Sequence, residues 1–289
     1  MTRPPEFRRI AILGTGLIGG SFGLAMRREF PAAVIVGYDR AEVLARAKAR
    51  GSITETAGDI ASAVRGADLV YIALPIGATV DSLPKIATAE QHALVTDSGG
   101  TKALICEHAL KHFHSGARFL GGHPMAGKEN SGIEHADADL FRGSRYALIG
   151  SESDPDPRVQ QFAALLRRIG AEPVWCDADT HDWAVGIVSH LPQLASVALA
   201  HVVADETDET GLPLMLAGPG LADMLRLAGS PYDIWRDTCL TNRENIAHAL
   251  DRLSQAIEYL RTRLTSKDLE HEFKIANELY RALRQSKPS

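Results

Sequence analysis

The sequence predicts an α/β protein, with an N-terminal doubly wound domain followed by an all-helical C-terminal domain. Short apolar, β-branched runs alternate with helical segments through residues 1–177, which is typical of a mostly parallel sheet with helices on both faces. From Asp179 onward these runs stop, and apolar residues recur at three- and four-residue spacing instead. We therefore expect two domains, 1–177 and 178–289.

The expected strands are short and apolar on both faces, as strands buried inside a parallel sheet are. They are Arg9–Leu13, Val34–Tyr38, Leu69–Leu74, Ala93–Thr96, Arg118–Leu120, Tyr146–Ile149 and Pro173–Cys176. Helices are expected between them, including Ser21–Arg28 and, after the polar, turn-rich segment 151–157, Arg158–Ile169. This alternation predicts a doubly wound sheet.

Two apolar stripes predict the helices of the C-terminal domain. The first comprises Trp183, Ile187, Leu191, Leu194 and Ala198, and the second comprises Ile246, Leu250, Leu253, Ile257, Leu260 and Leu264. The second stripe is narrow and heptad-like, which suits the packing of one helix on another. We therefore expect the helical domain to supply a homodimer interface.

Composition and charge exclude several classes of function. The 289 residues are 45% hydrophobic and 23% charged, as in ordinary globular proteins, and the formal net charge of −5 argues against a nucleic-acid partner. Cys106, Cys176 and Cys239 form no CxxC pair, so we expect a reduced protein without disulfides and assign no metal. No signal-peptide pattern precedes the first strand and no uninterrupted apolar run has membrane-spanning length, so a cytoplasmic protein without a membrane partner is expected.

The segment from Gly14 to Gly19 has the GxGxxG pattern of a dinucleotide-binding turn, between a predicted strand and a predicted helix. Gly14 permits the tight turn, Gly16 lets a pyrophosphate approach the backbone, and Gly19 lets helix and strand pack closely. Leu17 and Ile18 begin the helix, whose N–H groups attract phosphate. The context predicts a Rossmann-type cofactor site.

Asp39 follows the second predicted strand, twenty residues after Gly19. A carboxylate there bonds the adenosine ribose hydroxyls and repels a 2′-phosphate, which favours NAD over NADP. Arg40 would accommodate that phosphate, so NADP stays open, and Asp39 as a simple turn residue is the alternative reading. Leu74 and Pro75, at the end of the third predicted strand, are expected to border the same cofactor.

His123 lies between glycines and Pro124 just after a predicted strand, where a packed core has no need of a histidine. A neutral imidazole there can accept a proton from a substrate hydroxyl while hydride leaves the same carbon. The alternative is a histidine that bonds the backbone of its own loop. We take His123 as the candidate catalytic residue.

Two further segments carry polar side chains among apolar neighbours. Ser189 and Gln193 share a helix face, and Pro192 should free the carbonyl of Val188 or kink the helix, which favours a cleft over a core role. Arg226 needs a carboxylate partner, which a ligand or the nearby Asp223 would supply. Both readings of Arg226 remain open.

The motifs GLIGGS, DSGGTK, GGHPMAGKENSG, SHLPQ, GPGLADMLRLAGS and IWRD follow one another along nearly the whole chain. In this order they resemble those of the prephenate/arogenate (cyclohexadienyl) dehydrogenase family. The resemblance implies an oxidoreductase of tyrosine biosynthesis that decarboxylates a cyclohexadienyl substrate oxidatively, with NAD or NADP as hydride acceptor. It also implies a helical, dimeric second domain.

By this resemblance His123 contacts the ring hydroxyl and Arg226 holds a substrate carboxylate. The pocket is implied to be shaped by Ser189, His190, Gln193 and Trp235. The chain departs from the family pattern at Gly100, where a serine is common and Thr101 would have to supply the hydrogen bond, and at Gln193, where a histidine is common. The neutral amide of Gln193 mildly favours arogenate over prephenate as the substrate.

Two other readings are compatible with the glycine turn. One is a β-hydroxyacid dehydrogenase or imine reductase of the same two-domain build, and the other is a nicotinamide-binding redox sensor without chemistry of its own. The sensor would explain Gly14 to Asp39 and leave His123 and Arg226 without a role.

Overall fold

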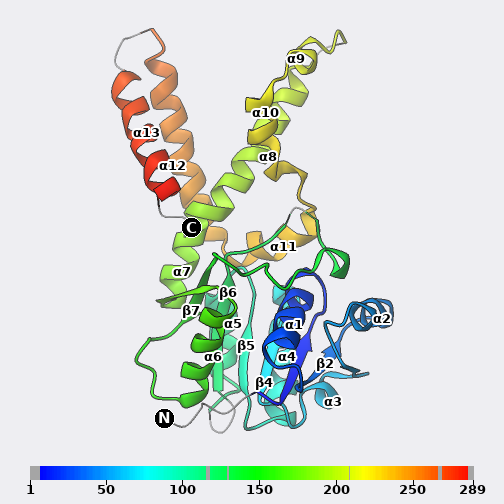
Figure 1. Ribbon diagram of the computed structural model, residues 1–289. Helices are drawn as coiled ribbons and strands as arrows, with labels where there is room; N and C mark the ends of the chain where they lie inside the picture. The colour runs from blue at the N-terminus through cyan, green and yellow to red at the C-terminus, as the bar shows by residue number, and fades with distance from the viewer. Residues whose placement is uncertain (1–6, 115–117, 129, 208, 266–268, 286–289) are drawn as a thin grey trace. The chain divides into compact units, whose positions relative to one another are not determined.

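A computed structural model describes residues 7–114, 118–128, 130–207, 209–265 and 269–285 (Figure 1). The chain forms two compact units. The first comprises residues 1–182 and 230–241, and the second comprises residues 183–229 and 242–289. The domain bounds expected from the sequence, 1–177 and 178–289, stay a prediction.

The first unit is built on an eight-stranded sheet in the order β3-β2-β1-β4-β5-β6-β7-β8. The strands are β1 (Arg9–Leu13), β2 (Val34–Tyr38), β3 (Glu55–Thr56), β4 (Leu69–Ile72), β5 (Leu94–Asp97), β6 (Arg118–Pro124), β7 (Arg145–Ile149) and β8 (Glu172–Cys176). Neighbours are parallel except β6 and β7, which are antiparallel. The predicted fold class is confirmed, and the sheet is mostly rather than entirely parallel.

Helices cover both faces of this sheet. They are α1 (Leu17–Glu29), α2 (Ala41–Ala49), α3 (Ile60–Val64), α4 (Ile76–Ala89), α5 (Ala103–Leu110) and α6 (Pro157–Arg168). The first unit also contains α11 (Tyr232–Thr241), which returns from later in the chain. Along β1, Ile10 and Ile12 enter the core under α1 and α6, whereas Ala11 and Leu13 enter the core under α3 and α4. Because successive side chains of a strand point to opposite faces, a strand buried on both must be apolar throughout.

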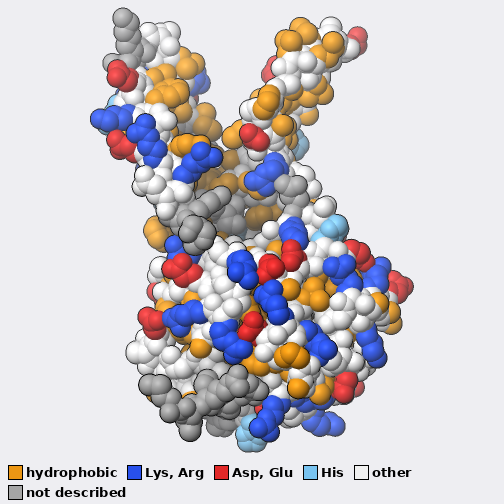
Figure 2. Space-filling model, viewed as in Figure 1, with side chains coloured by type: hydrophobic (Ala, Val, Ile, Leu, Met, Phe, Trp, Pro, Cys, Tyr) orange, Lys and Arg blue, Asp and Glu red, His pale blue; other side chains and the backbone are white. Residues whose placement is uncertain are grey.

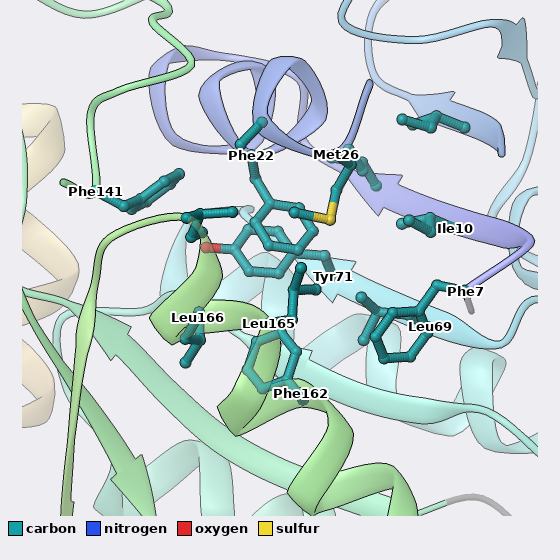
Figure 3. Close-up of a cluster of buried hydrophobic side chains, with 14 of the residues drawn as sticks. Phe7, Ile10, Phe22, Met26, Leu69, Tyr71, Phe141, Phe162, Leu165 and Leu166 are labelled. Atoms are coloured by element: carbon teal, nitrogen blue, oxygen red, sulfur yellow. The ribbon is translucent and has the colours of Figure 1, made fainter. Parts of the chain in front are cut away.

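The larger core is centred on stacked aromatic rings (Figure 3). Phe22 of α1 stacks on Tyr71 of β4 with ring centroids 3.8 Å apart and planes 5° from parallel. The hydroxyl of Tyr71 lies 3.1 Å from that of Tyr146, which satisfies both buried phenols. Burial raises the pKa of both tyrosines, so both stay neutral. Phe162 of α6 packs in the same core, on the face of the sheet that α1 covers.

The second unit contains only helices among its described residues. They are a π-helical turn (Gly186–His190), α8 (Leu191–Asp205), α9 (Leu212–Met215), α10 (Pro219–Leu225), a 3-10 turn (Leu227–Gly229), α12 (Arg243–Thr262) and α13 (Glu270–Gln285). Helix α7 (Ala178–Val185) begins in the first unit and ends in the second. Apolar side chains gather on the surface over α8 to α10 and over α12 and α13 (Figure 2).

One helical run in the described part of the chain, Ala178–Asp205, is long enough and apolar enough to cross a membrane by length and composition alone. From the sequence, no uninterrupted apolar run of that length was expected. The run is interrupted by His181, Asp182, His190 and Gln193, all of which are buried and hydrogen-bonded. These polar contacts suit a helix packed within a protein better than one in lipid.

Two strands differ from the prediction for local reasons. β6 continues to Pro124 because its end pairs antiparallel with β7, so His123 lies within the strand and opposite Ala147 rather than in a loop after it. β3 was not predicted, since it consists of only Glu55 and Thr56, both exposed at the edge of the sheet.

Candidate active site

The glycine turn between β1 and α1 is closely packed at two of its glycines and open at the third. Gly14 has φ +88°, and a Cβ there would overlap the carbonyl of Ala73. A Cβ on Gly19 would overlap the carbonyl of Gly14, whereas a Cβ on Gly16 would meet no described atom within 4 Å. The backbone is therefore accessible where a pyrophosphate must approach it, as the glycine pattern predicts.

The N-terminus of α1 is available to an anion. Its N-cap residue is Gly16, which has no side chain to bond the first N–H groups of the helix, and its first turn, which includes Leu17 and Ile18, carries no acidic residue. The first N–H groups of a helix have no partner within the helix and lie at the positive end of its dipole. This end of α1 fits the phosphates of a dinucleotide.

Asp39 holds the glycine turn from the end of β2. Its Oδ2 accepts the backbone N–H of Thr15 at 2.7 Å, and its Oδ1 accepts the N–H of Arg40 at 2.7 Å. The turn-residue role considered for Asp39 is thus present, together with a half-buried carboxylate beside the turn. Arg40 is exposed, and Leu74 and Pro75 follow the carbonyl of Ala73 that packs on Gly14.

A buried ion pair joins the ends of β5 and β6. Lys102 Nζ pairs with Asp97 and also donates to the carbonyl of Gly122 at 2.7 Å. Asp97 Oδ1 accepts the N–H of Gly122 at 3.1 Å, so both backbone groups of the residue before His123 are fixed. Asp97 and Lys102 begin and end the DSGGTK motif found in the sequence, but no role was predicted for either, although two opposite charges flanking a glycine pair after a buried strand are a signal that could have identified the ion pair.

His123 is half-buried and bonded to a second histidine. Its Nδ1 lies 2.9 Å from Nε2 of His181, and Nδ1 of His181 lies 2.8 Å from Oδ1 of Asp182. Asp182 also accepts the N–H groups of Lys102 at 2.7 Å and Ala103 at 2.9 Å. His181 and Asp182 were missed because they lie beside the expected domain boundary in a segment without glycine or proline.

Cys106 lies against the same strand, since a Cβ on Gly121 would touch its sulfur. Burial raises the pKa of the Cys106 thiol to about 12. Because the thiolate is the reactive form, this cysteine does not serve as a nucleophile near neutral pH.

Thr101 and Trp235 belong to the first unit. Thr101 is fully buried, and its hydroxyl lies 2.8 Å from that of Thr241, which itself donates to the carbonyl of Asp237 at 2.8 Å. The hydroxyl of Thr101 is therefore the donor and ties the loop after β5 to α11. Trp235 is half-buried on α11. The roles of both residues toward substrate stay predictions.

The second unit carries Ser189, His190 and Gln193 around a π-helical turn. The N–H of Leu191 bonds the carbonyl of Gly186, five residues earlier, so the irregularity expected from Pro192 takes this form. His190 is buried, with Nδ1 3.1 Å from the Asn242 amide nitrogen, and Ser189 is half-buried.

Arg226 is exposed at the end of α10, on a segment that α8 holds in place. Gln193 Nε2 donates to the carbonyl of Leu227 at 2.9 Å. Ser196 Oγ donates to the carbonyl of Met224 at 2.7 Å and accepts the N–H of Ala228 at 3.0 Å. Ser196 was not predicted, because nothing but its helical spacing from Gln193 distinguishes it in the sequence.

Two family models match the chain. Residues 22–174 match "Prephenate dehydrogenase, nucleotide-binding domain", and residues 177–285 match "Prephenate dehydrogenase, dimerization domain". The chain belongs to the prephenate dehydrogenase family. The resemblance found in the sequence motifs is thereby confirmed.

Members of the prephenate dehydrogenase family include close matches over nearly the whole chain. Prephenate dehydrogenase of Bacillus subtilis is 32% identical over 92% of this chain and 72% of its own length. The crystal structure of prephenate dehydrogenase from Aquifex aeolicus with hydroxyphenyl propionate and NAD+ has a TM-score of 0.87 at 25% identity, over 98% of this chain and 99% of that one. Synechocystis arogenate dehydrogenase has a TM-score of 0.75 at 27% identity, over 96% and 97% of the two chains.

Proposed function

We propose that this member of the prephenate dehydrogenase family oxidatively decarboxylates prephenate, arogenate or both, with NAD, in tyrosine biosynthesis. The observation that carries the proposal is the place of His123 in the sheet. The carboxyl ends of the parallel strands β1, β4, β5 and β6 lie at one edge, and this edge bears both the glycine turn and His123. Ligands of doubly wound sheets bind at this edge.

His123 acts on the ring hydroxyl of the substrate. When bound, NAD+ supplies the hydride acceptor for the carbon that carries this hydroxyl. His123 accepts a hydrogen bond from the hydroxyl and so stabilises the positive charge that develops there as hydride leaves. Cleavage of the bond to the ring carboxylate then releases carbon dioxide and leaves its electron pair in the ring, which becomes a phenol that retains the hydroxyl proton.

The cofactor residues are proposed as the sequence assigned them. Gly14, Gly16, Leu17, Ile18 and Gly19 approach the pyrophosphate, and the open face at Gly16 supports this assignment. Asp39 faces the adenosine ribose with Arg40 beside it, and its negative charge favours NAD. Leu74 and Pro75 border the site where the chain leaves β4.

The substrate residues are likewise a proposal. Arg226 holds a substrate carboxylate through charge-assisted hydrogen bonds, and the pocket is shaped by Ser189, His190, Gln193, Trp235 and Thr101. The Gln193 amide nitrogen already donates to Leu227, so its effect on the choice between prephenate and arogenate acts through the Arg226 segment as well as by its missing charge.

The protein is proposed to work as a cytoplasmic homodimer, without a membrane or nucleic-acid partner. The match to a dimerization domain supports the homodimer, as do exposed apolar side chains on α8, α12 and α13. A second copy that covers these side chains also accounts for the apolar character of Ala178–Asp205.

A four-way assay tests the proposed function, with prephenate or arogenate as substrate and NAD or NADP as cofactor, followed through the absorbance of the reduced nicotinamide. Turnover with NAD and at least one substrate is expected. Binding of NAD without turnover of either substrate would support the redox-sensor alternative instead.

A further inference from the structure

Three side chains of the first unit form a hydrogen-bonded chain that ends on His123. Asp182 Oδ1 meets His181 Nδ1 at 2.8 Å, and His181 Nε2 meets His123 Nδ1 at 2.9 Å. His181 is 4% exposed and Asp182 is 2% exposed, so bulk water does not replace either contact. A chain of this kind determines which nitrogen of each ring carries a proton.

The carboxylate end of the chain has a defined state. The N–H groups of Lys102 and Ala103 donate to the two oxygens of Asp182 at 2.7 and 2.9 Å. Hydrogen bonds donated to a carboxylate favour its ionised form, and an ionised carboxylate only accepts. His181 must therefore carry a proton on Nδ1.

The state of His123 follows from that of His181. A neutral His181 with its proton on Nδ1 presents a lone pair at Nε2, which accepts the N–H of His123 Nδ1. A neutral His123 with its proton on Nδ1 carries its lone pair on Nε2. This is the tautomer that can accept a hydrogen bond from a hydroxyl.

We propose that Asp182 and His181 are positioning residues that fix His123 in the Nδ1–H tautomer, with Nε2 as the acceptor for the substrate hydroxyl. The inference rests on the proposed function for the identity of that hydroxyl. Without the hydrogen bonds of Asp182 and His181, a share of the His123 rings carries the proton on Nε2. These rings present a donor where positive charge develops, which raises the free-energy barrier to hydride transfer. Substrate binding is affected less, because neither positioning residue is assigned a contact with substrate.

Two substitutions of His181 separate this role from a structural one. His181→Phe keeps a ring of similar shape but removes the acceptor for His123. His181→Gln keeps an acceptor, since the amide oxygen reaches the position of Nε2. His112→Phe, at an exposed histidine just after α5, is the matched control.

We expect His181→Phe to lower kcat by roughly 10- to 100-fold, by analogy with the effect of residues that orient a metal-bound histidine. KM should change little, His181→Gln should recover most of the lost kcat, and His112→Phe should match the wild type. If the role of His181 were merely structural, kcat would instead fall alike in both His181 variants, in proportion to their loss of thermal stability.

Nitrogen NMR of protein labelled in its histidine rings reads the tautomer directly and needs no turnover. In the wild type the His123 signal should report a protonated Nδ1 and an unprotonated Nε2. This pattern should persist in His181→Gln and become mixed in His181→Phe. A wild-type His123 protonated on Nε2 would overturn the proposal even if the enzyme is active, whereas absence of turnover with the expected tautomer would overturn only the proposed function.

Discussion

At the scale of single residues, the proposed chemistry depends on the imidazole of His123. The substitution His123→Asn keeps a polar side chain on β6 but moves its acceptor away from the substrate hydroxyl. We expect kcat to fall by roughly 10²- to 10⁴-fold, as for a positioned acid–base group, because the interaction is strongest in the transition state. Steady-state assays measure this, and a kcat within about threefold of wild type would exclude His123 as the catalytic contact.

Arg226 has two candidate partners, a substrate carboxylate and Asp223. If it holds the substrate, Arg226→Ala chiefly raises KM, because it removes binding shared by ground state and transition state. Asp223→Ala is the matched variant, since both residues are exposed near the end of α10. An increase in KM for Arg226→Ala alone supports the substrate role, and equal increases for both variants support the internal pair.

The sequence could predict the site residues that stand next to glycine or proline. His123 and the cofactor glycines are flanked by glycine or proline, whose backbone roles are readable without a structure. His181 and Asp182 lack such marks, and their function depends on contacts with His123, 58 residues away, and with Lys102, 80 residues away. Contacts of this range follow only from the assembled sheet.

At the scale of elements, apolar runs predict strands well when both faces are buried. β1, β2 and β4 were found on this basis, whereas the two exposed residues of β3 have no apolar signal. The length of β6 could not be predicted, because its last residues are ordered by pairing with β7, a partner that lies more than twenty residues later. Pro192 predicted an irregularity at the start of α8, and one is present there. It takes the form of a π-helical turn, whereas the sequence predicted a kink or a freed carbonyl.

Helix α8 is predicted to position Arg226 through Ser196. The Ser196 hydroxyl bridges the carbonyl of Met224 and the N–H of Ala228, so it fixes both sides of the arginine. Ser196→Ala removes both bonds, each worth roughly 1 kcal/mol, and we expect KM to rise by roughly 2- to 10-fold with little change in kcat. Ser62→Ala, which removes an exposed contact with Asp59 on α3, serves as the control in the same assay. An unchanged KM for Ser196→Ala would show that the segment keeps its place without these bonds.

At the scale of the whole molecule, the two units bury their apolar surface differently. The sheet unit completes its core from within, with helices on both faces. The helical unit leaves large apolar side chains exposed on α12 and α13 and just after α12, including Ile257, Leu264, Phe273, Leu279 and Leu283. The heptad-like stripe of the sequence thus continues onto surface that the single chain does not cover, which is why sequence and structure both favour a dimer.

This uncovered apolar surface predicts self-association. We expect the protein to sediment as a dimer of the 31.2 kDa chain at micromolar concentration. Phe273→Asp places a charge at a side chain that is 66% exposed on α13 and should shift the mass toward that of the monomer, because a charge buried without a partner is costly. Leu110→Asp is the matched control, since Leu110 is 74% exposed but belongs to the sheet unit. Sedimentation equilibrium distinguishes the cases. A wild-type monomer would exclude the dimer, and equal dissociation of both variants would show that the interface is not specific to the helical unit.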